Sequence, residues 1–80
     1  MAVLRLFAQA REAAGTGSAE IPGASVGEVL DEASRRYGTA FDDVAATCKV
    51  WLNGEPANRE AVVGGHDEVA VLPPISGGFW

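Results

Sequence analysis

The segment between Ser25 and Gly38 constrains the fold more than any other part of this sequence. Ser25 is a favourable N-cap, Glu28 stands at the capping-box position, and Gly38 suits the residue that follows a helix. Apolar residues recur at helical spacing at Val26, Val29, Leu30, Ala33 and Tyr37. We therefore predict an amphipathic helix of about three turns, which must bury its apolar stripe against another element.

The polar side of this helix predicts two ion pairs. Asp31 precedes Arg35 by four residues, and Glu32 precedes Arg36 by the same spacing. Side chains four residues apart are neighbours on a helix surface, and each such pair contributes about 0.2–0.5 kcal/mol to helix stability.

The segments on either side of the helix show the period-two alternation and the turn residues of β-strands. We predict strands within residues 2–8, 16–21, 48–52, 55–57 and 68–72. Asn53-Gly54 predicts a tight hairpin between the third and fourth strands. Pro56 restricts the fourth strand to a sheet edge, because proline has no N–H to donate to a ladder.

Two further segments are less regular. Residues 9–14 are rich in helix formers and stop at Gly15, which predicts one or two helical turns. Residues 39–47 are predicted to be a connecting segment, with Phe41 and Val44 available to fill the edge of the core.

The order strand, strand, helix, strand, short strand, strand indicates an α+β fold in which a mixed sheet wraps around one main helix. The β-grasp fold has this order. A ferredoxin-like fold or another small α+β fold would accept the same elements, so the pattern alone does not decide between them.

Composition and charge restrict the classes of function. The chain has 80 residues, a net charge of −5 and 48% apolar residues, as expected for one globular domain. Its single cysteine excludes an internal disulfide and a four-cysteine metal site. The six basic residues form no stripe that would neutralise phosphates, which argues against nucleic-acid binding.

No apolar run approaches the length that spans a bilayer, and the first residues lack the basic leader and the apolar stretch of a signal peptide. We therefore expect no membrane association and a cytoplasmic location.

Three stretches of the chain resemble the MoaD/ThiS family of sulfur carriers, whose members share the ubiquitin-like β-grasp fold. They are Leu6-Phe7-Ala8 with Arg11-Glu12-Ala13-Ala14-Gly15, then Leu52-Asn53-Gly54-Glu55, and then Asp67 to Gly78. The last stretch is the most specific, and the likeness is closest to the MoaD branch, the small subunit of molybdopterin synthase. The resemblance implies a β-grasp domain over residues 1–74 and a flexible tail over residues 75–80.

The resemblance also implies a carrier or non-catalytic subunit, and not an enzyme. An E1-like adenylating enzyme would use ATP and magnesium to adenylate the carboxylate of Gly78, with Gly77 beside it. A sulfur donor would convert the adenylate into a thiocarboxylate, and a synthase, such as a MoaE-like large subunit, would accept the sulfur. The chain itself would bind no cofactor and no metal.

The residue types of the tail suit this chemistry. Gly77 and Gly78 have no Cβ, so their backbone can enter a narrow channel and adopt dihedrals closed to other residues. Pro73-Pro74 makes the exit from the last strand stiff. The six residues beyond Pro74 reach about 20 Å when extended, so the tail can enter a partner's active site while the domain stays outside.

Phe79 and Trp80 depart from the family pattern, in which the chain ends at the second glycine. While they are attached, the Gly78 carbonyl belongs to an amide and cannot be adenylated. We interpret the two aromatics as a removable cap, cut after Gly78 by a zinc metalloprotease of the JAMM type. The alternative is that both stay and the protein is a family-derived binding module.

Alternation places Phe7, Trp51 and Leu72 on the sheet face away from the helix, where they would form an exposed apolar surface for partners. The alternative is that neighbours or the chain's own aromatic tail cover them. Arg11, in the matching motif, and Ile75, in the tail, complete the predicted partner-binding residues. For Arg11, a solvated side chain without a partner is the alternative.

The remaining reactive residue types receive structural interpretations. By alternation along its strand, Cys48 faces the core, and it is interpreted as a residue that fills the core. His66 lies in a turn without further metal ligands and is interpreted as a surface residue. Asp67 and Glu68 are interpreted as solvated loop charges.

Two functions from other classes stay open. The chain could be a ubiquitin-like protein modifier joined to target lysines through Gly78, or an interaction domain with no acyl chemistry. Lys49 is its only lysine, so few sites exist for building chains on itself.

Overall fold

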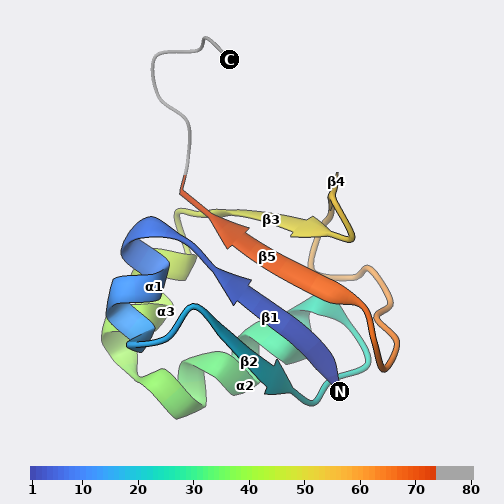
Figure 1. Cartoon of the computed structure of the whole chain (residues 1–80), viewed down its shortest axis with the longest axis horizontal. Helices are drawn as coiled ribbons and strands as arrows, with labels where there is room; N and C mark the ends of the chain where they lie inside the picture. Colours follow the sequence, from blue (N-terminus) through green and yellow to red (C-terminus); the bar gives the residue numbers. More distant parts are fainter. Residues whose placement is uncertain (74–80) are drawn as a thin grey trace, which may run out of the picture.

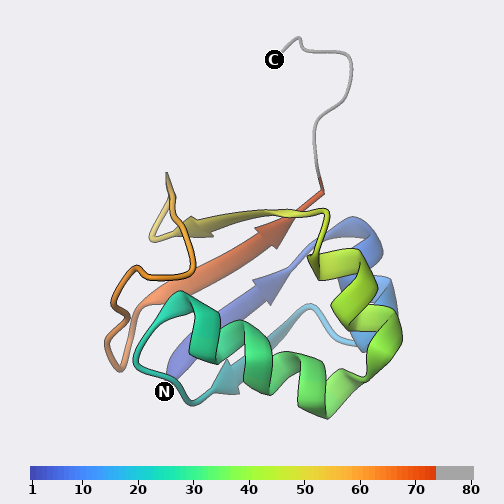
Figure 2. The same cartoon turned by 180° about the vertical axis from the view of Figure 1, so that it is seen from behind.

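Five strands form one mixed sheet, and the main helix crosses one of its faces (Figure 1, and from behind in Figure 2). The computed structural model describes residues 1–73, and residues 74–80 lie outside the described part. The strands are β1 (Ala2–Leu6), β2 (Ser18–Ile21), β3 (Lys49–Leu52), β4 (Glu55–Pro56) and β5 (Glu68–Leu72). The helices are α1 (Ala8–Ala14), α2 (Val26–Tyr37) and α3 (Thr39–Ala45).

The strands lie in the order β2-β1-β5-β3-β4. β1 and β5 are parallel, and the other neighbouring pairs are antiparallel. β4 is an edge strand of two residues, as Pro56 predicted. This sheet around α2 confirms the predicted α+β, β-grasp arrangement.

The N-terminus of α2 confirms the predicted cap, with one change. The Ser25 hydroxyl accepts a hydrogen bond from the Glu28 N–H at 3.2 Å. The Glu28 carboxylate accepts from the N–H of Ala24 at 2.9 Å, which is one residue before the N-cap. In a capping box the Glu28 side chain would accept from the N–H of the N-cap Ser25, and here it accepts from the preceding N–H. Both side chains still satisfy backbone donors at the start of the helix.

The loop before β5 satisfies the other donors at this helix end. The N–H groups of Val26 and Gly27 donate to the carbonyls of Ala61 and Arg59 at 2.9 and 2.8 Å. A Cβ at position 27 would stand 3.2 Å from the Arg59 carbonyl oxygen, so glycine allows this close approach. The loop and the helix are thus joined through their backbones.

One hydrophobic core lies between the sheet and the helices. It consists of Ala2, Leu4, Leu6, Ala10, Ile21, Val26, Val29, Leu30, Ala33, Phe41, Val63, Val69 and Val71. Among them Phe41 is fully buried, and it packs edge-to-face against Tyr37 with 5.5 Å between the ring centroids.

The prediction that residues 39–47 form an irregular connection is wrong, because residues 39–45 form helix α3. Gly38, with φ of 92°, ends α2 and redirects the chain into the new helix. Phe41 and Val44 then stand on the same side of α3, three residues apart, and contact the core. Burial of Phe41 stabilises a helix too short to be identified from its own pattern.

One of the two predicted ion pairs on α2 is wrong. Glu32 pairs with Arg36 at 3.3 Å, as predicted, and also with Arg35 at 3.2 Å. Asp31 instead binds Arg59 at 2.7 Å. The backbone contact between Gly27 and Arg59 brings this arginine to the helix, and it takes the position that Arg35 was predicted to fill.

The predicted first strand is too long at its C-terminal end. β1 ends at Leu6, and Ala8 has a left-handed backbone with φ of 52°. The chain turns there into α1, so Phe7 lies at the junction as the N-cap of the helix.

We predict that Phe41→Ala lowers the free energy of unfolding by about 3–5 kcal/mol, because it leaves a cavity at a fully buried position. Urea titration followed by far-UV circular dichroism measures the change. Phe7→Ala is the matched control, since Phe7 is exposed, and should cost less than about 1 kcal/mol. Equal losses for the two variants would contradict this account of the core.

Candidate functional site

The described part of the candidate site is the sheet face around the end of β5. Gly77, Gly78, Phe79 and Trp80, together with Ile75, lie outside the described residues. The predicted division into residues 1–74 and 75–80 therefore stays a prediction. What the structure places is Pro73, directly after β5, and the side chains that surround this exit.

Three side chains form a row on the face of the sheet away from α2. In the strand register Arg5 is beside Ala70, and Ala70 is beside Trp51. Residues that alternate with them, such as Val71, belong to the buried core. We call Arg5, Ala70 and Trp51 the outer row.

Leu72 lies one step closer to the exit, on the same face as the outer row. Its register partner is Lys49 on β3. The parallel pairing of β1 with β5 ends at Leu6 and Val71, and Phe7 and Leu72 are the residues that directly follow this last pair. The structure thus gathers Phe7, Trp51 and Leu72 on one face, next to the point from which the tail leaves.

Two of these three side chains are accessible. Phe7 is 38% exposed and Trp51 is 37% exposed, whereas Leu72 is half-buried. The Arg5 guanidinium stands 6.0 Å from the centroid of the Phe7 ring, a cation–π distance, and also pairs with Glu68 at 3.1 Å. The result is an apolar surface edged by the Arg5–Glu68 ion pair.

Arg11 does not join this group. It lies on α1, and a Cβ at position 17 would be 3.5 Å from the Arg11 side chain, so the arginine extends over Gly17. The Gly17 carbonyl accepts a hydrogen bond from the Leu6 N–H on the β2 side of β1. Leu72 and Trp51 lie on the other side of β1, on β5 and β3. Arg11 is exposed there and belongs to a different part of the surface.

A hydrogen-bond network that sequence reasoning missed holds the far end of β3 and β5. Asn53, with a left-handed φ of 51°, accepts from the Glu68 N–H at 2.9 Å and donates to the Asp67 carboxylate at 3.1 Å. The other Asp67 oxygen accepts from the Gly64 N–H at 2.7 Å. The only signal was the turn residue Asn53 itself, whose side chain often binds nearby backbone groups.

The interpretation of Asp67 and Glu68 as solvated loop charges is therefore incomplete: Asp67 lies in the loop, Glu68 begins β5, and both accessible carboxylates have specific partners. Glu68 pairs with Arg5 across two strands. The backbone N–H of Gly64 and, next, the amide of Asn53 hold the pKa of the Asp67 carboxyl below its ordinary value, because both stabilise the charged form.

The other candidate residues show no arrangement for catalysis. Cys48 is half-buried against the core, and burial raises the pKa of its thiol, which disfavours the nucleophilic thiolate. His66 is exposed in the turn before Asp67. Within residues 1–73, no three histidine, cysteine or acidic side chains are grouped to hold a metal ion.

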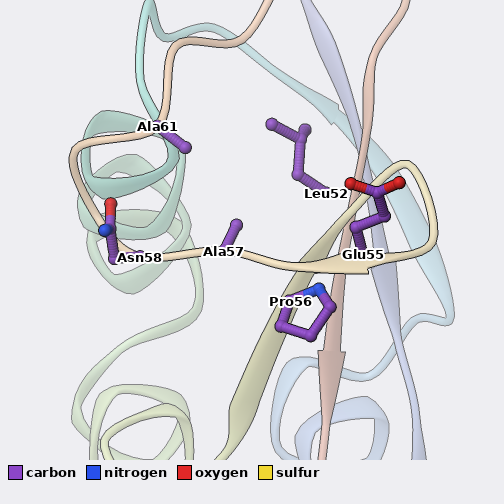
Figure 3. A pocket seen from close by; sticks show the side chains of 6 residues that line it. All are labelled: Leu52, Glu55, Pro56, Ala57, Asn58 and Ala61. Carbon is purple, nitrogen blue, oxygen red and sulfur yellow. The ribbon is translucent and has the colours of Figure 1, made fainter.

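An open pocket lies between the β3–β4 hairpin and the segment 57–61 (Figure 3). Its lining consists of Leu52, Glu55, Pro56, Ala57, Asn58 and Ala61. Glu55 is the only ionisable residue in this lining, so the pocket has no acid–base pair among the described residues. It lies at the opposite end of β3 from the tail exit.

None of the helices in the described part of the chain is long and apolar enough to cross a membrane.

Comparisons with known proteins agree with this geometry. The model of the ThiS family matches residues 4–78. The molybdopterin synthase sulfur carrier subunit of Chlamydomonas reinhardtii is 38% identical over 78 residues, covering 90% of this chain and 92% of that protein. The subunit of the same name from Arabidopsis thaliana is 34% identical over 76 residues, covering 91% of this chain and 78% of that protein.

A solved structure shows the same fold. The solution structure of the small archaeal modifier protein 1 from Methanosarcina acetivorans has a TM-score of 0.86 and 28% sequence identity. The match covers 96% of this chain and 95% of that one. The match to the ThiS family model extends to Gly78 and leaves Phe79 and Trp80 beyond it.

We predict that Asp67→Asn removes part of the acid sensitivity of folding. Because the folded-state pKa is lowered, Asp67 contributes stability at pH above its ordinary pKa of about 3.8. This contribution is lost as the pH falls through the folded-state pKa. Urea unfolding at a series of pH values from about 6 down to about 2 should therefore show a shallower loss of stability for the variant.

Asp43→Asn is the matched control, since Asp43 is exposed on α3. It should leave the slope of stability against pH close to that of the unchanged protein. If Asp67→Asn and Asp43→Asn change the slope equally, the network around Asn53 is not its source.

Proposed function

This chain belongs to the ThiS family, and from that premise we propose that it is a sulfur carrier whose reactive carbon is the carbonyl of Gly78. The observation that carries the proposal is the extent of the match, which begins at residue 4, within β1, and continues to this glycine. Two relatives of this chain are sulfur carrier subunits of molybdopterin synthase, which favours molybdopterin synthesis as the destination of the sulfur.

The proposed reaction takes place in two steps on an E1-like adenylating enzyme. The Gly78 carboxylate attacks the α-phosphorus of ATP and forms an acyl-adenylate, and pyrophosphate leaves. Sulfur delivered at the oxidation level of hydrosulfide then attacks the carbonyl carbon, a C–S bond forms, and the C–O bond to AMP breaks. ATP and magnesium belong to that enzyme, and this chain supplies the carboxylate.

The division of labour between tail and domain supports this proposal. A carboxylate that must enter another protein's active site needs a slender approach, and Gly77-Gly78 has no side chains to obstruct it. The domain needs to be recognised and to hold the start of the tail in place. Pro73, placed directly after β5, provides that start.

We assign recognition to the apolar surface beside the exit, formed by Phe7, Trp51 and Leu72. Exposed aromatic side chains on a rigid sheet are suitable anchors for a partner, because little conformational entropy is lost when they are buried. Ile75 would extend this surface along the tail, and Arg11 would contribute only to a partner that also reaches the β2 side. The partners are the E1-like enzyme and a sulfur-accepting synthase, such as a MoaE-like large subunit.

The residues after Gly78 require a processing step. In the chain as it stands, the Gly78 carbonyl is bonded to the nitrogen of Phe79, and no carboxylate is available. We propose that a JAMM-type metalloprotease hydrolyses this bond and releases Phe79 and Trp80. Water supplies the oxygen of the new Gly78 carboxylate, which then enters the carrier cycle.

A second function is favoured by one specific observation. The chain has the fold of a protein named as a small archaeal modifier, at 28% identity. A modifier would use the same Gly78 adenylate, but a lysine of a target protein would attack it in place of sulfur. Chemistry at Gly78 is common to both functions, and the acceptor distinguishes them.

We predict that the chain ended at Gly78 gains about 16 Da when it is incubated with its E1-like enzyme, ATP, magnesium and a sulfur source, because sulfur replaces one oxygen. Intact-protein mass spectrometry measures the gain. The chain that retains Phe79 and Trp80 is the control and should show no gain. Conjugates to other proteins would instead indicate the modifier, and no ATP-dependent change would refute acyl chemistry.

We predict that Trp51→Ala weakens binding to the E1-like enzyme by about tenfold or more, while the domain stays folded. Isothermal titration with the Gly78-ended chain measures the affinity, and circular dichroism checks the fold. Val62→Ala is the matched control, because Val62 is 79% exposed in the loop before β5, away from the outer row. Unchanged affinity in Trp51→Ala would remove Trp51 from the docking surface.

A further inference from the structure

The open edge of β2 has most of its backbone hydrogen-bonding groups occupied by side chains of the same chain. β2 is the outermost strand of the sheet, beyond β1 (Figure 1). An edge strand presents a row of N–H and C=O groups that can pair with a strand of another molecule. Whatever occupies those groups therefore decides whether a further strand can be added to the sheet.

The strand register shows which groups of β2 point toward the open edge. Val3 on β1 is opposite Glu20, and the Val3 N–H donates to the Asp67 carbonyl, on the side away from β2. In an antiparallel pair, opposite residues either bond to each other or both point away. The N–H and C=O of Glu20, and those of Ser18 two residues earlier, are thus the four groups that an incoming strand would bind.

The Thr16 hydroxyl occupies both groups of Ser18. Its Oγ1 donates to the Ser18 carbonyl at 3.0 Å and accepts from the Ser18 N–H at 3.4 Å. A hydroxyl can donate and accept at the same time, so one short side chain satisfies both groups. Thr16 lies just before β2, and its side chain binds where a neighbouring strand would bind.

Arg36 occupies the carbonyl of Glu20. It lies in the last turn of α2, and its Nη1 donates to this carbonyl at 3.3 Å. Its Nε pairs with the Glu32 carboxylate, one turn earlier on the helix, at 3.3 Å. The guanidinium is therefore held between the helix and the strand. Of the four outward groups, the Glu20 N–H alone has no acceptor within residues 1–73.

The opposite edge of the sheet is protected in a different way. β4 has two residues, and one of them is Pro56, which has no N–H to offer. β2 has the sequence Ser-Ala-Glu-Ile and no proline, so its protection comes from side chains outside the strand.

We propose that Thr16 and Arg36 close the β2 edge to strand addition by a second copy of this chain. The excluded arrangement is an antiparallel β2–β2 pair about a twofold axis, in which Ser18 of one copy is opposite Glu20 of the other. This pair would use all four outward groups of each copy. It requires Thr16 and Arg36 to release three of them, so new hydrogen bonds only replace existing ones. The inference goes beyond the proposed function and does not depend on it.

The double variant T16V/R36A tests the proposal. Thr16→Val keeps the shape of the side chain and removes the hydroxyl, and Arg36→Ala removes the guanidinium. In sedimentation equilibrium we expect the variant to dimerise with a dissociation constant about tenfold or more below that of the unchanged chain, because its edge groups are free to pair. Far-UV circular dichroism verifies the fold. Equal self-association of the two proteins overturns the proposal.

T47V/R35A is the matched control. The Thr47 hydroxyl also donates to a nearby backbone carbonyl, that of Val44 at 3.0 Å, and Arg35 also pairs with Glu32, at 3.2 Å. The same kinds of side chain are removed, but neither of these bonds involves β2. The control should associate no more than the unchanged chain. Dimerisation as strong as that of T16V/R36A would overturn the assignment to the β2 edge.

Two further measurements locate the contact. Glu20→Pro, added to T16V/R36A, removes an outward N–H, a change that an edge strand tolerates, and should abolish the dimer. Without that substitution, the Glu20 amide should exchange its hydrogen about tenfold or more slowly in the T16V/R36A dimer than in the unchanged monomer, as followed by NMR. A dimer that leaves this exchange rate unchanged forms elsewhere and overturns the proposal. No partner enzyme is needed, so the result is separate from the mass gain expected at Gly78.

Discussion

The parallel pairing of β1 with β5 is the constraint on which the rest of the structure depends. It joins two strands that are far apart in sequence, with Leu4 beside Val69 and Leu6 beside Val71. All four side chains point into the core and are buried. Parallel neighbours need a long crossover, and here that crossover contains all three helices. Phe7 and Leu72 directly follow the last pair of this register, so the pairing that builds the core also determines which residues come next to the exit of the tail.

The crossover is held against the sheet at the start of α2. Backbone carbonyls of the loop before β5 accept hydrogen bonds from the N–H groups of Val26 and Gly27. The Arg59 side chain adds an ion pair with Asp31. These bonds satisfy donors that a helix N-terminus would otherwise leave to water. They also explain how a segment with little regular structure, between β4 and β5, can be firmly attached.

The two faces of the sheet have separate roles. The face toward α2 is apolar and buried, and its substitution would cost stability. The outer face carries Arg5, Ala70 and Trp51, which contribute less to the core and are available for contact. In the proposed function the reactive atom belongs to Gly78, so the domain would need a rigid support and a surface that partners recognise. The outer row supplies such a surface.

Much of the fold could be predicted from the sequence, because local signals and burial agree over the strands and over α2. The alternation along β5, the cap at Ser25 and the edge position of Pro56 each follow from short-range chemistry. The Gly77-Gly78 motif and the two aromatics after it are also properties of the sequence alone.

Other features were decided only by tertiary structure. Helix α3 forms because the core buries Phe41, and seven residues are too few to show a helical pattern by themselves. Asp31 binds Arg59 and not Arg35, since a backbone contact distant in sequence delivers the arginine. The row of Arg5, Ala70 and Trp51 draws one residue from each of three strands, and strand order is set by packing, which no single stretch of the chain encodes.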